Sequence, residues 1–293
     1  TDADTDADTD TDTDTDTDPG GDSPRTLLNL NGESWKFIRE DFSSNEPVDA
    51  GFDDSGWLDI TLPHDWNGGV DGVHDDVFDG PSMYMGPGWY RGTFTVPEDF
   101  ADRRITIKFE AISSVSDVYL NGEHLGEHRG GYTAFGFDVT DVVNVDAENM
   151  IVVRATNEND PKVAPWMAIP FGTFPRSSDY ALYGGIYRDV WLEAKSRVFV
   201  DTHFHETPSV SADSATVTFR TTVDNTGTSD TEVSLVTEIV DSSGETIESA
   251  EDTSQIAAGE STGFEGSIDV AQPALWSPAS PNLYTVRSTV YVD

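Results

Sequence analysis

The chain has 293 residues and a net charge of −39, from 55 acidic and 16 basic residues, and it contains no cysteine. The negative charge argues against nucleic acid and anionic membranes as partners, because both would repel the chain. Without cysteine there are no disulfides and no thiolate metal sites, and no apolar run approaches the ~18 residues of a membrane span. The charge predicts a halophilic protein, since molar salt screens self-repulsion to within about 3 Å; a mesophilic secreted protein with an acidic tail is the alternative.

Residues 1–24 form an acidic segment in which aspartate alternates with threonine or alanine until Pro19-Gly20-Gly21. Nothing in this segment can be buried, so folding could not offset about 1–2 kcal/mol of backbone entropy per residue. We therefore expect a disordered linker here. A spacer of this kind suits a secreted or cell-surface protein, with a cytoplasmic location as the alternative.

From Leu27 onward the chain has the alternating pattern of half-buried strands. Residues 89–97 alternate apolar and polar side chains and end at a proline, which predicts a strand. Residues 115–126 predict a hairpin, because Asn121-Gly122 is the favoured pair for a type I′ turn. These segments indicate an all-β domain.

A long loop and a glycine pair follow. Residues 157–178 include several prolines, and a loop of more than about 15 residues within a compact domain is usually functional. The loop carries Trp166 and two phenylalanines, which can offer an aromatic face to the C–H groups of a pyranose or fill the core of the loop itself. Gly184-Gly185 then predict a sharp turn into a strand over residues 186–192.

Several segments match motifs of a known family. The motifs are Leu62-Pro63-His64-Asp65-Trp66, the Asn121-Gly122 hairpin with Gly130 to Phe135 after it, and the run from Asp179 through Gly185-Ile186-Tyr187-Arg188-Asp189-Val190. In this order they resemble the sugar-binding domain of family 2 glycoside hydrolases, the β-galactosidase and β-glucuronidase group. The resemblance implies a galactose-binding-like jelly-roll sandwich over residues 25–196.

Residues 197–293 differ in composition, since Ser, Thr, Asp and Glu here alternate with Val, Ile and Phe. Five short segments of this kind at regular spacing suit a β-sandwich. Residues 275–278 and 281–284 resemble the signature that introduces a late strand of the family's immunoglobulin-like domain, and this strand would cover residues 284–292. We therefore expect an immunoglobulin-like β-sandwich that lacks its last strand.

No catalytic residue is expected in the chain. Retaining glycosidases need two carboxyl groups about 5–5.5 Å apart, and in the resembled family both are glutamates on the strands of a (β/α)8 barrel. The alternating helix and strand pattern of such a barrel does not occur here. The acidic pairs Asp53-Asp54 and Asp75-Asp76 are typical of solvated loops. The run His64-Asp65-Trp66 is expected to be a structural turn, because adjacent residues cannot form a relay on one face.

The resemblance assigns a substrate role to Asp179. In β-galactosidase-like members an aspartate at this position reaches the mouth of the barrel and accepts hydrogen bonds from sugar hydroxyls, in some cases ligating a sodium ion. Trp166 is the second candidate substrate-binding residue, through stacking. Arg188 and Asp189 are expected to hold structural ion pairs. No metal site is expected within the chain, since its histidines lack zinc spacing and the pair His203-x-His205 lacks a third ligand.

The resulting hypothesis is the non-catalytic N-terminal portion of a β-galactosidase-like glycoside hydrolase. Such a portion would bind a β-glycoside at the rim of the active site, dock on a C-terminal catalytic barrel and support contacts within a homo-oligomer, with no cofactor of its own. The alternative is a stand-alone carbohydrate-binding or surface adhesion protein. The preferred sugar is not decided by the sequence, because the family selects it mainly through barrel residues.

Overall fold

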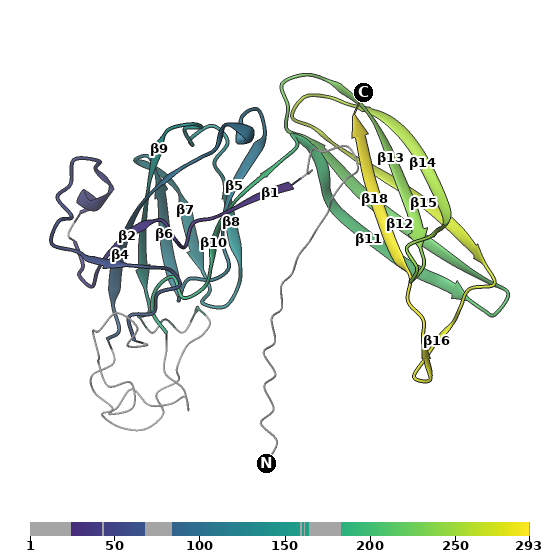
Figure 1. Cartoon of the computed structure of the whole chain (residues 1–293), viewed down its shortest axis with the longest axis horizontal. Coiled ribbons are helices and arrows are strands. Elements are labelled where there is room, and N and C mark those ends of the chain that lie inside the picture. Colours follow the sequence, from purple (N-terminus) through teal and green to yellow (C-terminus); the bar gives the residue numbers. More distant parts are fainter. Residues whose placement is uncertain are drawn as a thin grey trace, which may run out of the picture.

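The computed structural model describes residues 25–42, 44–67, 84–158, 160, 162–163 and 183–292. Within these ranges the chain is built from β-strands and two short 3-10 helices, Glu46–Val48 and Glu98–Phe100 (Figure 1). No helix in the described ranges is long and apolar enough to cross a membrane. The fold class predicted from the sequence, all-β, is confirmed.

The first half of the chain is a jelly-roll of two antiparallel sheets. The larger sheet has the order β3-β2-β4-β9-β6-β7, and the smaller one has the order β1-β10-β5-β8. The strands of the larger sheet are β2 (Ser34–Ile38), β3 (Leu58–Ile60), β4 (Pro87–Thr95), β6 (Val115–Leu120), β7 (Glu123–Arg129) and β9 (Glu148–Thr156). Those of the smaller sheet are β1 (Arg25–Asn29), β5 (Arg104–Phe109), β8 (Phe135–Asp138) and β10 (Val190–Lys195).

The core of the jelly-roll lies between its two sheets and is filled by alternate residues of the strands. On β10 the side chains of Val190, Leu192 and Ala194 are completely buried, as alternation along a strand requires. Trp191 and Lys195, on the opposite face of the same strand, remain partly exposed. The smaller sheet therefore presents a second face, which carries both apolar and charged side chains, away from the core.

Two predictions for this half have definite outcomes. The hairpin is confirmed, because Asn121 and Gly122 connect β6 and β7 with φ values of 51° and 87°, as a type I′ turn demands. The strand expected over residues 186–192 begins four residues later, at Val190. Ahead of it, Gly185 forms an isolated bridge to Ser113, so the backbone there is committed to a different partner.

The second half is an immunoglobulin-like sandwich. Its sheets have the orders β11-β12-β15 and β14-β13-β18, and a small hairpin, β16-β17, precedes the last strand. The strands are β11 (Val198–Val210), β12 (Ser214–Asn225), β13 (Thr231–Val240), β14 (Thr246–Ile256), β15 (Ser261–Ala271), β16 (Trp276–Ser277), β17 (Ser280–Pro281) and β18 (Thr285–Val292). All five strands expected from the alternating segments are present.

Each sheet of this sandwich has two edge strands, and β18 is the last of them along the chain. Strand β18 pairs with β13 along one side, and no described strand pairs with its other side. Tyr291 and Val292 at the end of β18 are exposed. Before β18, the side chains of Trp276 in β16 and of Leu283 in the connection from β17 are 60% and 69% exposed. An exposed strand edge beside large apolar side chains favours association with further polypeptide.

Candidate functional site

The motif Leu62 to Trp66 follows β3 and runs against the glycine pair that precedes β10. The backbone N–H of His64 donates to the carbonyl of Ile186 at 2.7 Å, and that of Trp66 donates to Gly184 at 3.1 Å. His64 and Trp66 are almost completely buried. Two motifs that lie about 120 residues apart in the sequence are thus joined by a short stretch of backbone pairing.

Both residues of the glycine pair are required by close packing. A β-carbon on Gly184 would lie 2.0 Å from the indole of Trp66, and one on Gly185 would lie 2.0 Å from the hydroxyl of Tyr90. Gly185 also has a φ of +102°, a conformation that other residues rarely adopt. The glycines therefore let the chain pass directly over the buried aromatic rings.

Side-chain hydrogen bonds tie together the chain segments at this end of the jelly-roll. Asp65 Oδ1 accepts from the backbone N–H of Gly184 at 3.0 Å. The side-chain amides of Asn67 and Asn157 both donate to the carbonyl of Tyr84, each at 3.0 Å. We call these five residues the stem clamp. Asn67 and Asn157 are buried, and burial excludes competing water from their hydrogen bonds.

The stem clamp joins four points of the chain that flank two long segments. Asn67 and Tyr84 flank residues 68–83, while Asn157 and Gly184 flank the stretch that contains residues 164–182. Burial raises the pKa of Tyr84 above its ordinary value, so its hydroxyl stays protonated and donates to the carbonyl of Pro87 at 2.7 Å. The described residues that flank both segments are therefore held together by the stem clamp.

The two predicted substrate-binding residues, Asp179 and Trp166, lie outside the described residues, as does the pair Asp75-Asp76. Their attachment points are described, and the stem clamp holds these together at one end of the fold. The predicted role of Asp179 and its sodium ion therefore stay predictions.

His64 and Asp65 do not form a catalytic relay. His64 Nδ1 lies 2.8 Å from the hydroxyl of Tyr90, and the imidazole packs on the ring of Phe37 at a centroid distance of 4.6 Å. Asp65 instead accepts backbone hydrogen bonds from Asn67 and Gly184. The motif is a buried structural element, as expected. Tyr90 was missed because nothing in the β4 pattern distinguishes it from an ordinary core residue.

Two expectations about charged residues need correction. Asp54 is not merely a solvated loop acid, because its carboxylate lies 2.7 Å from Nε of the buried Arg91 and neutralises it. Asp189 accepts a hydrogen bond from the side chain of Asn31 at 2.8 Å, and the Arg188 guanidinium lies 5.8 Å from the ring centroid of Tyr187. Within the described part of the chain, these contacts take the place of the expected ion pairs.

The described residues contain no group of three or more metal-ligating side chains placed to hold an ion. His203 Nδ1 lies 2.9 Å from the hydroxyl of Thr221 and 3.2 Å from that of Ser288. Its ring is 5.6 Å from that of His205. This arrangement connects the two sheets of the second sandwich through β11, β12 and β18.

Two domain models of one sequence family match the chain, one for each sandwich. Residues 74–196 match the sugar-binding domain of glycosyl hydrolases family 2, and residues 198–293 match the domain described as glycosyl hydrolases family 2. The chain belongs to family 2 of the glycosyl hydrolases. The galactose-binding-like jelly-roll and the immunoglobulin-like sandwich are the architecture that the resemblance implied.

Known proteins similar to this family 2 chain are longer. A β-glucuronidase of Formosa agariphila is 28% identical over 283 residues, which is 92% of this chain and 28% of the relative. A β-galactosidase of Bacteroides ovatus is 29% identical over 272 residues, 92% of this chain and 30% of the relative. The solved structure of β-glucuronidase 2 of Bacteroides uniformis, covalently bound to cyclophellitol-6-carboxylate aziridine, superposes with a TM-score of 0.76 and 32% identity. The match covers 92% of this chain and 30% of the chain in that structure.

Proposed function

We propose that this family 2 chain is the N-terminal portion of a β-glycosidase and that it completes the sugar site of a catalytic (β/α)8 barrel. The observation that carries the proposal is the stem clamp, which fixes the origins of residues 68–83 and 164–182 at one end of the jelly-roll. A catalytic constellation benefits from loops that start at rigid, buried supports, since small displacements of a contact reduce rates strongly.

The proposed substrate is a β-glycoside. The similar proteins with known activity are β-glucuronidases and β-galactosidases, and this chain spans about 30% of their length. In the proposed assembly Asp179 accepts hydrogen bonds from sugar hydroxyls and Trp166 stacks on the pyranose ring. The barrel supplies the acid and the nucleophile, so the reaction is hydrolysis of an O-glycosyl bond.

The second sandwich is the proposed scaffold for the barrel. The exposed Trp276 and Leu283 and the open side of β18 provide apolar surface and unpaired backbone groups where further polypeptide can dock. Contacts within a homo-oligomer could use the same surface, and the family 2 resemblance is the reason for expecting them.

The proposal is tested by comparing the glycosidase activity of residues 1–293 with that of the protein encoded by the complete reading frame. We expect no turnover of nitrophenyl β-galactoside or β-glucuronide by residues 1–293 alone, and turnover by the complete protein that Asp179→Asn reduces. Hydrolysis by the short chain, abolished by a substitution within it, would overturn the proposal. A complete protein without a barrel and with tight sugar binding would establish a carbohydrate-binding or adhesion protein instead.

A further inference from the structure

The outward face of the smaller jelly-roll sheet carries a cavity that is separate from the stem clamp. Strand pairing places Trp191 opposite Lys108, and Lys108 opposite Gly136. In the same way, Glu193 of β10 lies opposite Leu27 of β1. Since residues two apart on a strand share a face, these side chains all point away from the core. None of them belongs to the stem clamp.

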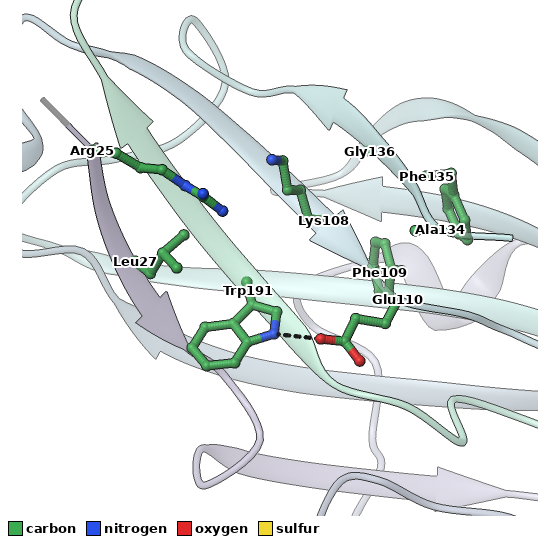
Figure 2. Close-up of a pocket in the computed structure, with 9 residues that line it drawn as sticks. All are labelled: Arg25, Leu27, Lys108, Phe109, Glu110, Ala134, Phe135, Gly136 and Trp191. Carbon is green, nitrogen blue, oxygen red and sulfur yellow. Dashed lines mark hydrogen bonds between the residues drawn. The ribbon is translucent and has the colours of Figure 1, made fainter. Parts of the chain in front are cut away.

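The cavity has a volume of 590 Å³, within the roughly 300–1,000 Å³ of small-molecule sites. It is lined by Arg25, Leu27, Lys108, Phe109, Glu110, Ala134, Phe135, Gly136 and Trp191 (Figure 2). The lack of a side chain at Gly136 keeps part of this space open, because a β-carbon there would lie 3.3 Å from Cγ of Lys108 and 2.8 Å from the carbonyl oxygen of Ile107.

Cationic groups converge at one end of the cavity. Lys108 Nζ lies 2.7 Å and Arg25 Nε lies 2.6 Å from the same oxygen of Glu193, and Lys195 Nζ lies 3.7 Å from its other oxygen. These four side chains carry three positive charges and one negative charge. The Glu193 side chain is 2% exposed, whereas those of Arg25 and Lys108 are 48% and 41% exposed. The carboxylate is therefore covered, whereas the side chains of Arg25 and Lys108 remain partly accessible to a ligand.

An aromatic and apolar floor lies beside the cations. Figure 2 shows the Trp191 indole next to Leu27, with the Glu110 carboxylate on its other side. The indole Nε1–H donates to Glu110 Oε1 at 3.2 Å, which restrains the orientation of the ring. A ring held in this way suits the apolar C–H face of a pyranose, and a carboxylate beside it can accept hydrogen bonds from sugar hydroxyls.

We propose that this cavity binds an acidic saccharide, a short glycan that contains a uronic acid residue. The uronate carboxylate lies at Lys108 and Arg25, and the pyranose face lies on Trp191. The cations Arg25, Lys108 and Lys195 outnumber the carboxylates of Glu193 and Glu110 by three to two. In a chain with a net charge of −39, this local excess of cations favours an anionic ligand over a neutral one. This site goes beyond the proposed function and does not rest on it, because it uses a different surface and requires no barrel.

Titration calorimetry on the chain tests the site with two matched disaccharides. The probes are cellobiouronic acid, which carries one carboxylate, and cellobiose, which carries none. The buffer contains the lowest salt concentration at which circular dichroism shows the chain folded. We expect saturable binding of cellobiouronic acid that weakens with added salt, and binding of cellobiose weaker by about tenfold, since a charged hydrogen bond is lost.

Matched variants locate the binding. Lys108→Ala should weaken the binding of cellobiouronic acid about tenfold, and Lys108→Arg should retain most of it. Lys36→Ala is the control, because Lys36 is also a partly exposed cation paired with a carboxylate, Asp59 at 3.0 Å, but lies on the other sheet. It should leave the affinity unchanged. Thermal unfolding of each variant verifies that it is folded.

A second substitution keeps the test decisive if Lys108→Ala fails to fold. Trp191→Phe removes the indole hydrogen bond to Glu110 and reduces the aromatic surface on which a pyranose can stack. It should therefore weaken the binding of both disaccharides. Equal affinity for the two probes, no saturable binding, or an equal loss in Lys36→Ala would overturn the proposal. Activity of the complete protein would be unaffected by any of these outcomes, so the two proposals fail independently.

Discussion

Gly184 lies so close to Trp66 that a β-carbon at residue 184 would come within 2.0 Å of the indole nitrogen. Gly184 is also a member of the stem clamp, through its hydrogen bond to Asp65. The indole itself stacks on Phe37 at a centroid distance of 5.6 Å and an interplanar angle of 12°. The indole is completely buried, so it cannot shift to make room for a side chain at residue 184. A glycine is therefore required at this position.

Gly184→Ala should consequently destabilise the jelly-roll by about 1–3 kcal/mol, as overpacking of a core does. Unfolding followed by tryptophan fluorescence reports this domain, since six of the seven tryptophans precede residue 197. Gly32→Ala is the control, because nothing lies within 4 Å of its added β-carbon. Equal midpoints for Gly184→Ala and the parent chain would contradict the packing described here.

Asp65→Ala should also destabilise this domain, by about 1–3 kcal/mol, because the backbone N–H groups of Gly184 and Asn67 would lose their acceptor. Urea unfolding measures the effect. Asp59→Ala removes a highly exposed carboxylate and should change the free energy of unfolding by no more than about 1 kcal/mol. If the two variants were equally stable, the hydrogen bonds of Asp65 would contribute nothing to the clamp.

The contribution of Glu193 to the stability of the jelly-roll should depend on pH. Burial alone would raise the pKa of Glu193, but the hydrogen bond from Lys108 and the charges of Lys108, Arg25 and Lys195 together hold it below its ordinary value. A carboxyl group with a lowered pKa in the folded state stabilises the fold above its unfolded pKa of about 4.3. This contribution is lost as the pH falls through the lower folded pKa.

Glu193→Gln should therefore lower the free energy of unfolding by about 1–2 kcal/mol near neutral pH, a value reduced by the exposure of the cationic partners. The difference from the parent chain should shrink as the pH drops below about 4. Glu127→Gln, in an exposed pair with Arg129 at 3.4 Å, is the matched control and should have little effect at any pH. A difference that grew toward acid pH would be inconsistent with the lowered pKa.

The halophile hypothesis predicts that salt stabilises the chain. A net charge of −39 repels itself most strongly at low ionic strength, where the screening length is longest. The thermal unfolding midpoint should therefore rise from about 0.1 M to about 3 M potassium chloride. Sucrose at matched osmolality controls for general solute effects. An unchanged midpoint across the salt series would favour a mesophilic protein with an acidic tail.

Asp179→Asn in the complete protein should lower both kcat and kcat/KM, because the proposed hydrogen bonds to sugar hydroxyls tighten in the transition state. The loss of one charge-assisted hydrogen bond corresponds to roughly 1.5–3 kcal/mol, or about 10- to 150-fold in rate. The unfolding midpoint should barely move. Asp201→Asn, at an exposed position on β11, is the control. Unchanged kinetics with a lowered midpoint would assign Asp179 a structural role.

Elements whose structure depends on neighbouring residues were predicted correctly from the sequence. Alternating side chains predicted the strands of the second sandwich, and Asn121-Gly122 predicted the hairpin turn, because each depends on neighbouring residues alone. The start of β10 was predicted four residues too early. Ile186 and Tyr187 have strand-like side chains, but the backbone before Val190 is held by His64, Ser113 and other residues distant in the sequence.

Contacts between distant residues were beyond a single sequence. The clamp residues Asn67 and Asn157 are ordinary loop asparagines in the sequence, and only the fold brings both to the carbonyl of Tyr84. The cluster around Glu193 was missed for the same reason. Its cations come from β1, β5 and β10, so their convergence depends on strand order and register, which alternation alone does not specify.

The open side of β18 has a consequence for how the protein behaves at high concentration. On the side where no described strand pairs with β18, its N–H and C=O groups form a template to which another extended chain can pair. The exposed Tyr291 and Val292 would add apolar contact to such pairing. Residues 1–293 in isolation should then self-associate edge to edge, more so in molar salt, where charge no longer keeps the copies apart. A short strand supplied as a peptide would act as a cap that keeps the molecules dispersed.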